Sequence, residues 1–126
     1  FYNVYGGREN PDGEFATVIA KFLNRRHMNK KLYITKPGTQ TRNFTYIDDT
    51  IDALKIIAEK GTGDEYGIAN PNAYSIDEVA KLISDNIEYV KKNPANRMSS
   101  QVVTKKIFDL GWKPRQELSD YIKNNL

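Results

Sequence analysis

The chain has 126 residues, of which 39% are hydrophobic and 28% are charged, and its formal net charge is +3 with an isoelectric point near 9.0. These values indicate a single soluble, globular domain and exclude a disordered chain, and no apolar run approaches the ~20 residues of a membrane helix. A mild positive charge suits an anionic ligand, but it is equally typical of a solvated surface.

The sequence contains no Cys and one His, His27, which excludes disulfides, thiolate catalysis and a histidine-rich metal site. The chain opens on Phe1–Tyr5, without the basic segment and apolar run of a signal peptide, and we expect a cytoplasmic protein. Because the chain does not begin with Met, we expect a fragment or a processed product, with residues 1–126 forming one domain.

The first predicted element is a helix over Glu14–Met28, because apolar side chains recur there at helical spacing. Basic residues collect at its end, where positive charge suits the helix dipole. Two short strands are predicted next, Leu32–Thr35 and Asn43–Ile47, with a turn at Lys36–Gly38 between them.

A second helix is predicted from Asp48 or Asp49 to Gly61, with its apolar residues facing inward: Ile51, Leu54, Ile57 and Ala58. A brief strand over Tyr66–Ala69 follows. The sequence Ser75-Ile76-Asp77-Glu78 then matches a capping box, which predicts a third helix from Ser75 to about Lys92.

The pattern finally predicts a short helix over Lys105–Leu110, capped by Gly111, and a last helix over Leu118–Asn125. Helices alternating with a few short strands predict a mixed α/β domain, with too few strands for a complete doubly wound fold. Periodicity predicts these residues to be mostly buried: Phe15, Val18, Phe22, Leu54, Ile57, Val79, Leu82 and Ile83.

Read without analogy, the residues offer no catalytic centre and no metal site. One His and no Cys leave little for a hydrolytic triad, and the carboxylate pair Asp48-Asp49 is more typical of a helix start than of acid–base chemistry. The sequence Gly61-Thr62-Gly63 lacks the third glycine and the strand-to-helix setting of a phosphate loop.

An anion site is the remaining candidate. Arg42 stands at the start of a predicted strand, with Gln40 two residues before it, and Asn3 and Arg8 lie in a glycine-containing loop. An arginine on a rigid element donates two parallel hydrogen bonds to phosphate oxygens. The basic cluster Arg25–Lys31 lacks interleaved aromatic residues, so we predict a solvated helix end and no nucleic-acid partner.

These residues resemble the extended short-chain dehydrogenase/reductases, and within them the NAD-dependent nucleotide-sugar epimerases and dehydratases. The segment Phe1–Arg8 resembles their asparagine-valine-tyrosine-glycine-proline-arginine loop, and Thr39–Asp49 resembles their glutamine-x-arginine … tyrosine-valine-aspartate-aspartate hallmark. Weaker matches follow in order at Glu14–Phe22, Tyr66–Asn70 and Lys105–Pro114.

The resemblance implies the carboxy-terminal, substrate-binding part of such an enzyme, with a UDP-glucose or UDP-N-acetylglucosamine 4-epimerase favoured. NAD and the catalytic groups belong to an amino-terminal Rossmann half that this sequence lacks, so the fragment alone is predicted inactive. The resemblance also implies a nucleotide-sugar site with these residues: Asn3, Phe15, Val18, Tyr33, Thr35 and Arg42. A homodimer is typical of the complete enzymes.

Three departures bear on this expectation. Gly7 replaces the usual proline, Asn43 replaces an acid, and Asn93–Asn96 lacks the second diphosphate-binding arginine, for which we expect Arg97 to substitute. These departures leave the nucleotide open: UDP is the first choice, with dTDP, GDP and ADP as alternatives. The alternatives are a 4,6-dehydratase, an ADP-heptose 6-epimerase and a non-catalytic nucleotide-sugar-binding domain.

Overall fold

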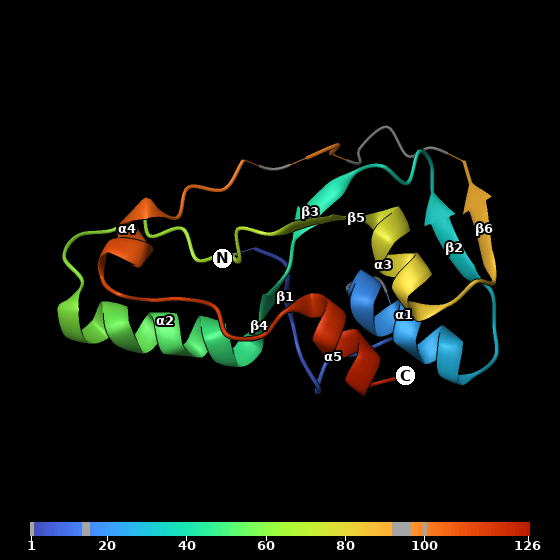
Figure 1. The fold of residues 1–126 in the computed structure, drawn as a ribbon, viewed down its shortest axis with the longest axis horizontal. Helices are drawn as coiled ribbons and strands as arrows, with labels where there is room; N and C mark the ends of the chain where they lie inside the picture. Colours follow the sequence, from blue (N-terminus) through green and yellow to red (C-terminus); the bar gives the residue numbers. More distant parts are fainter. Residues whose placement is uncertain (1, 14–15, 92–96, 100) are drawn as a thin grey trace.

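A computed structural model describes residues 2–13, 16–91, 97–99 and 101–126 of the chain. Its elements form an elongated mixed α/β arrangement, with α2 and α4 toward one end and the β2–β6 pair at the other (Figure 1). The helices are α1 (Val18–His27), α2 (Ile47–Lys60), α3 (Ile76–Ile83), α4 (Lys105–Asp109) and α5 (Leu118–Asn124). The strands are β1 (Val4–Tyr5), β2 (Leu32–Thr35), β3 (Thr41–Asn43), β4 (Thr45–Tyr46), β5 (Ala73–Ser75) and β6 (Ile87–Val90).

The strands form two-stranded sheets within the described part of the chain. β1 pairs in parallel with β4, β2 pairs in parallel with β6, and β3 pairs antiparallel with β5. The β3–β5 register sets Arg42 opposite Tyr74. The predicted α/β class is confirmed, and the structure has more short strands than the pattern predicted.

Helix starts follow local sequence signals. The side chain of Ser75 accepts from the amide of Glu78, and the carboxylate of Glu78 accepts from the amide of Ser75, which confirms the predicted capping box. The hydroxyl of Thr17 caps α1 by accepting from the amide of Ala20, and it also donates to the carboxylate of Glu9 at 2.6 Å.

The predicted end of the third helix is wrong. α3 ends at Ile83, because Ser84, Asp85 and Asn86 form a turn in which the Ser84 hydroxyl accepts from the amide of Asn86. Ile87–Val90, which were assigned to the same helix, form β6, which pairs with β2 along all four residues of each strand, and Lys92 lies outside the described residues. Backbone pairing with β2 thus overrides the helical spacing of Val90.

Two strand predictions also need correction. Tyr66–Ala69 has no strand partner in the described residues, and the pairing strand is β5, a few residues later. The predicted strand Asn43–Ile47 divides into β3 and β4, and Ile47 already begins α2. The strand Leu32–Thr35 is confirmed.

The buried apolar side chains form two clusters that share no member. The larger one packs α1, α3 and α5 around β2, and includes Ile19, Phe22, Leu32, Val79 and Leu118. The smaller one lies between α2 and α4 and contains Ala53, Ile68, Ile107 and Trp112. The single tryptophan also donates its indole N–H to the carbonyl of Asp49 at 2.8 Å.

Asp49 connects α2 to the carboxy-terminal segment. Its side chain is buried, and one carboxylate oxygen accepts from the amides of Arg115 and Gln116, both at 3.0 Å. Within the described residues, the role of this acid is structural. Its position at a helix start favours this role over acid–base chemistry, as predicted.

The core prediction is confirmed for Phe22, Val79 and Ile83, which are buried, and Val18 and Ile57 are half-buried. It is wrong for Leu54 and Leu82, which are 45% and 41% exposed, and Phe15 lies outside the described residues. The inward face predicted for α2 is confirmed at Ile57, which packs against the smaller cluster, and is otherwise wrong, because Ile51 is 41% exposed and Ala58 is exposed. α2 instead packs through Asp49, Thr50 and Ala53, the side that meets Trp112 and its neighbours.

Tyr5 supplies a test of the larger cluster. Its ring is 1% exposed and packs against Tyr46 and Tyr121, and its hydroxyl has no hydrogen-bond partner in the described residues. An unpaired buried hydroxyl costs roughly 1–3 kcal/mol, so Tyr5→Phe is expected to leave the free energy of unfolding unchanged or to raise it by about 1 kcal/mol. Urea unfolding at pH 7 measures this change.

The same residue predicts a pH dependence. Burial raises the pKa of the Tyr5 hydroxyl far above its ordinary value of 10.0, with the charges of Asp49 and Glu117 adding to the effect. Because the folded-state pKa is the higher one, the protein is expected to lose stability as the pH rises above 10, where the unfolded chain ionises first. Tyr5→Phe should lose less stability between pH 9 and about 11. An equal alkaline loss in both proteins would contradict the assignment.

Candidate functional site

A cavity of about 380 Å³ lies between the start of α1, the strands β2 and β3, and the start of α3. Five residues of the predicted site line it: Asn3, Val18, Tyr33, Thr35 and Arg42. They come from four separate parts of the chain, so the fold brings together what the sequence places up to 39 positions apart. Phe15, also predicted for this site, lies outside the described residues.

The connection between β2 and β3 is fixed by Gln40. Its side chain is buried, its amide nitrogen donates to the carbonyl of Thr35 at 2.9 Å, and its amide oxygen accepts from the amide of Gly38 at 2.7 Å. Gly38 has a positive φ of 86°, which suits glycine, and its carbonyl accepts from the amide of Asp77. Gln40 thus holds the turn that presents β3, and its polar atoms are occupied within the protein.

Arg42 lies on β3 as a half-buried cation. One guanidinium nitrogen donates to the carbonyl of Thr41 at 2.7 Å, and no carboxylate of the described residues lies within ion-pair distance. Arg42 therefore forms no ion pair with Asp48 or Asp49. Burial lowers the pKa of the Arg42 guanidinium from its ordinary value, and the neighbouring charge of Arg97 lowers it further.

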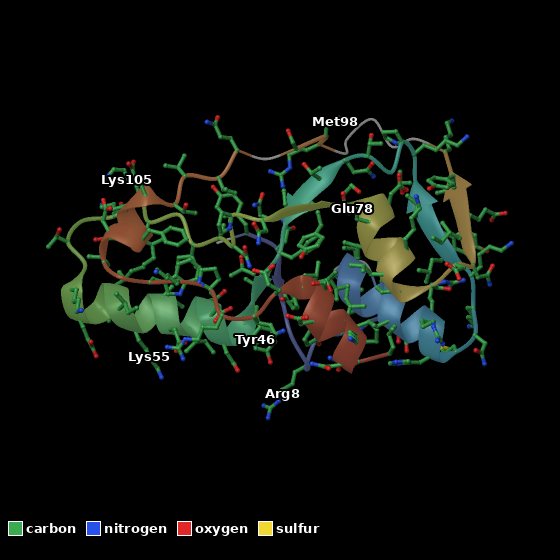
Figure 2. All side chains as sticks on the ribbon, viewed as in Figure 1. Arg8, Tyr46, Lys55, Glu78, Met98 and Lys105 are labelled. Atoms are coloured by element: carbon green, nitrogen blue, oxygen red, sulfur yellow. The ribbon has the colours of Figure 1, made fainter. Side chains whose placement is uncertain are left out.

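Arg97 lies near Arg42 because a backbone hydrogen bond holds its segment beside β3. The carbonyl of the next residue, Met98, accepts from the amide of Thr41 at 2.7 Å, which attaches the segment 97–99 beside β3 (Figure 2). Arg97 does not line the cavity. Two like charges near one another favour an anion between or beside them, because each cation raises the local positive potential.

Asn3 lines the same cavity and has a left-handed backbone conformation, with a φ of 38°. Its side-chain amide donates to the carbonyl of Asn43 at 3.2 Å, and its own carbonyl accepts from the amide of Thr45. Asparagine tolerates this conformation better than most residues. Its exposed side chain is thereby held beside β3.

Sequence reasoning missed five further residues that line the cavity: Ala16, Lys21, Phe22, Phe44 and Ile76. Lys21 is the informative one, because it lies one turn after Val18 on α1, and helical spacing from Val18 could have located it. Tyr33 on β2 carries the guanidinium of Arg25 over its ring at 4.9 Å. Arg8 is not part of this cavity, and its side chain points away from the molecule (Figure 2).

The described residues contain no group of three or more His, Asp or Glu side chains that could hold a metal ion. Among the same residues, no helix is long and apolar enough to cross a membrane. The ring nitrogen Nε2 of His27 lies 2.8 Å from the carbonyl oxygen of Asn125, and His27 does not line the cavity. None of the described residues that line the cavity is an aspartate, glutamate, histidine or cysteine.

Comparison with known proteins identifies the class. The model of the NAD dependent epimerase/dehydratase family matches residues 1–70, more than half of the chain, and the chain belongs to this family of extended short-chain dehydrogenase/reductases. The chain is 32% identical over 138 aligned positions to dTDP-D-glucose 4,6-dehydratase from Homo sapiens, covering 98% of this chain and 38% of that protein.

Two solved structures show the same fold. The UDP-glucose 4-epimerase of Thermotoga maritima, solved with UDP-glucose, matches with a TM-score of 0.85 and 26% identity, over 97% of this chain and 41% of that one. The UDP-glucuronic acid 4-epimerase of Bacillus cereus, solved with UDP-glucuronic acid and NAD, matches with a TM-score of 0.84 and 26% identity, again over 97% and 41%. The chain thus spans about two fifths of the length of these proteins.

Proposed function

We propose that this chain binds the nucleotide-diphosphate portion of a nucleotide sugar, with a UDP-sugar favoured, as part of an NAD-dependent enzyme. The observation that carries the proposal is Arg42, a half-buried guanidinium with no acidic partner in the described residues, on the wall of a cavity. None of the described residues that line this cavity is acidic. A planar guanidinium in such a place suits the oxygens of a diphosphate.

The other lining residues have complementary roles in this proposal. Arg97 adds positive charge from the neighbouring segment and takes the place of the second arginine that the resemblance implied. Val18 provides an apolar contact at the entrance, and Tyr33 and Thr35 on β2 lie beside the base. Asn3 presents its amide to the phosphates or the sugar.

The residues of this chain do not fit NAD. Gly61 caps the end of α2, and the segment after it leads to no helix until α3, so Gly61–Gly63 has no strand-to-helix setting for a pyrophosphate. We therefore assign NAD to the rest of the complete protein and derive no catalytic step from this chain. Its contribution is to use binding energy at the nucleotide to orient the sugar for reaction elsewhere.

The reaction that we propose for the complete protein is 4-epimerisation of a UDP-sugar. The two solved structures with UDP-sugars favour it. A 4,6-dehydratase acting on a dTDP-sugar is the second candidate, favoured by the 32% identity to the human dehydratase. A cytoplasmic location and a homodimeric complete enzyme remain predictions.

Binding and product analysis test these proposals separately. Calorimetric titration of the complete protein with UDP and dTDP is expected to show an affinity in the micromolar range for one nucleotide and a weaker affinity for the other. Incubation with UDP-glucose should yield its 4-epimer, whereas incubation with dTDP-glucose that releases water would favour the dehydratase. No measurable affinity for either nucleotide would remove the proposed site.

The 126-residue chain on its own is expected to turn over neither substrate, because it contains no dinucleotide fingerprint and no proton-transfer pair at the cavity. Chromatographic product analysis after prolonged incubation measures this. Turnover by the purified chain would show that the catalytic groups lie within these residues after all.

A further inference from the structure

Lys21 is a second cation on the wall of the cavity that Arg42 lines, and the proposed function gives it no role. Its side chain is exposed, and no carboxylate of the described residues lies within ion-pair distance of it. Its backbone is fixed at the start of α1, because its amide donates to the carbonyl of Thr17 at 2.9 Å. A lysine ammonium has three donors and no acceptor, so Lys21 presents hydrogen-bond donors to the cavity.

The helical position of Lys21 places it near Tyr33. Val18, Lys21 and Arg25 follow one another at spacings of three and four residues, which sets them on one face of α1. The guanidinium of Arg25 lies over the ring of Tyr33 at 4.9 Å, so this face of α1 is turned toward Tyr33. Lys21 and Tyr33 also line the same cavity. Lys21 therefore lies on the side of the cavity where the base is proposed to bind.

Lys21 also marks one margin of the cavity. A second hollow of about 300 Å³ begins there, and Lys21 lines both hollows. The second hollow is lined by the chain before α1, by α1 itself and by the turn after it, and by no described residue of β3, the strand that carries Arg42. Lys21 thus lies at the end of the cavity away from Arg42. A nucleotide whose diphosphate lies at Arg42 directs its base toward Lys21.

The edge of a pyrimidine base that lies farthest from the ribose distinguishes uracil and thymine from cytosine. Uracil and thymine carry the acceptor O4 there, whereas cytosine carries an amino group that donates. An ammonium forms a charge-assisted hydrogen bond with a carbonyl oxygen. Opposite an amino group it places one donor against another, and neither finds an acceptor. A lysine at this edge therefore discriminates between bases that share the same ribose and diphosphate.

We propose that Lys21 selects the nucleobase, and that its ammonium donates to O4 of uracil or thymine and disfavours cytosine. The same rule disfavours adenine, which carries an amino group where guanine carries the acceptor O6. Of the nucleotides that the sequence leaves open, ADP is then the poorest ligand. This inference rests on the proposed function, because it concerns the base of the nucleotide that Arg42 is proposed to bind.

Calorimetric titration of the complete protein with UDP and with CDP tests the proposal, because the two nucleotides differ only in the base. The unmodified protein is expected to bind UDP at least about tenfold more tightly than CDP, as one hydrogen bond to a charged group allows. In Lys21→Ala the ratio of the two affinities should fall to about one, because the donor is lost. Lys21→Glu should reverse the preference, since a carboxylate accepts from the amino group of cytosine.

Lys81→Ala is the matched control, because Lys81 is an exposed lysine of α3 that does not line the cavity. This variant should keep the affinity ratio of the unmodified protein. If Lys21→Ala weakens the binding of UDP and CDP by the same factor, Lys21 contributes only charge and the proposal is overturned. Binding of UDP with one affinity ratio in all variants overturns base selection alone, whereas no binding of either nucleotide to the unmodified protein overturns the proposed function as well.

Discussion

Arg42→Ala in the complete protein is expected to weaken nucleotide-sugar binding by about one to two orders of magnitude, because a charge-assisted bond to a diphosphate contributes roughly 1.5–3 kcal/mol. Arg42→Lys should recover part of this affinity, since an ammonium keeps the charge but loses the two parallel hydrogen bonds. Calorimetric titration with the preferred nucleotide measures the three affinities.

Arg115→Ala is the matched control, because Arg115 is exposed and lies outside the cavity. Its affinity for the nucleotide should equal that of the unmodified protein, and the affinity for NAD should be the same in all variants. If Arg42→Ala binds the nucleotide as tightly as Arg115→Ala does, Arg42 has no place in the site. A loss of stability alone would assign Arg42 a structural role.

Trp112→Ala is expected to cost about 3–5 kcal/mol of unfolding free energy, the range typical of a large aromatic removed from a packed core. Trp112 is 2% exposed, packs against Phe108 at a ring distance of 5.5 Å and fills the centre of the smaller cluster. Urea unfolding followed by far-ultraviolet circular dichroism measures the change without depending on the lost indole fluorescence.

Trp112→Phe separates packing from hydrogen bonding. It keeps an aromatic ring beside Phe108 but removes the indole hydrogen bond to the carbonyl of Asp49, and one such bond contributes about 0.5–1.5 kcal/mol. The phenylalanine variant should therefore be the more stable of the two. A cost below about 1 kcal/mol for Trp112→Ala would show that the smaller cluster is loosely packed.

Local signals predicted the elements whose ends are determined locally. The capping box placed the start of α3, and alternating burial over Leu32–Thr35 agrees with the predicted strand. β6 was missed because its stability comes from pairing with β2, more than fifty positions away in sequence, and helical spacing over the same residues gave a competing pattern. Pairing between strands that are distant in sequence produces no periodic pattern in the local sequence.

Of the candidate site, the residues named through resemblance converge on one cavity where the structure describes them, Arg97 excepted, and their binding role stays a prediction. Physical reasoning from the sequence had singled out Arg42 and Asn3 as well, but it also included Arg8, which lies elsewhere, and Gln40, whose amide holds a turn. How many donors and acceptors of a polar side chain are left for a ligand depends on its hydrogen bonds within the protein, and that distinction requires coordinates.

The inward face of α2 illustrates a different kind of failure. The apolar spacing of Ile51, Leu54 and Ala58 is a sound signal for burial, yet these side chains face solvent in this chain. Periodicity marks a face as apolar and does not report what that face packs against.

The division of the core into two clusters with no shared member has a consequence for how such a protein changes during evolution. Phe22 and Ile76, which line the cavity, belong to the larger cluster, whereas α2 packs on the smaller one. Substitutions at distant sites without common partners have nearly additive effects on stability. Substitutions among the cavity residues of the larger cluster are thus expected to leave the stability of the smaller cluster nearly unchanged.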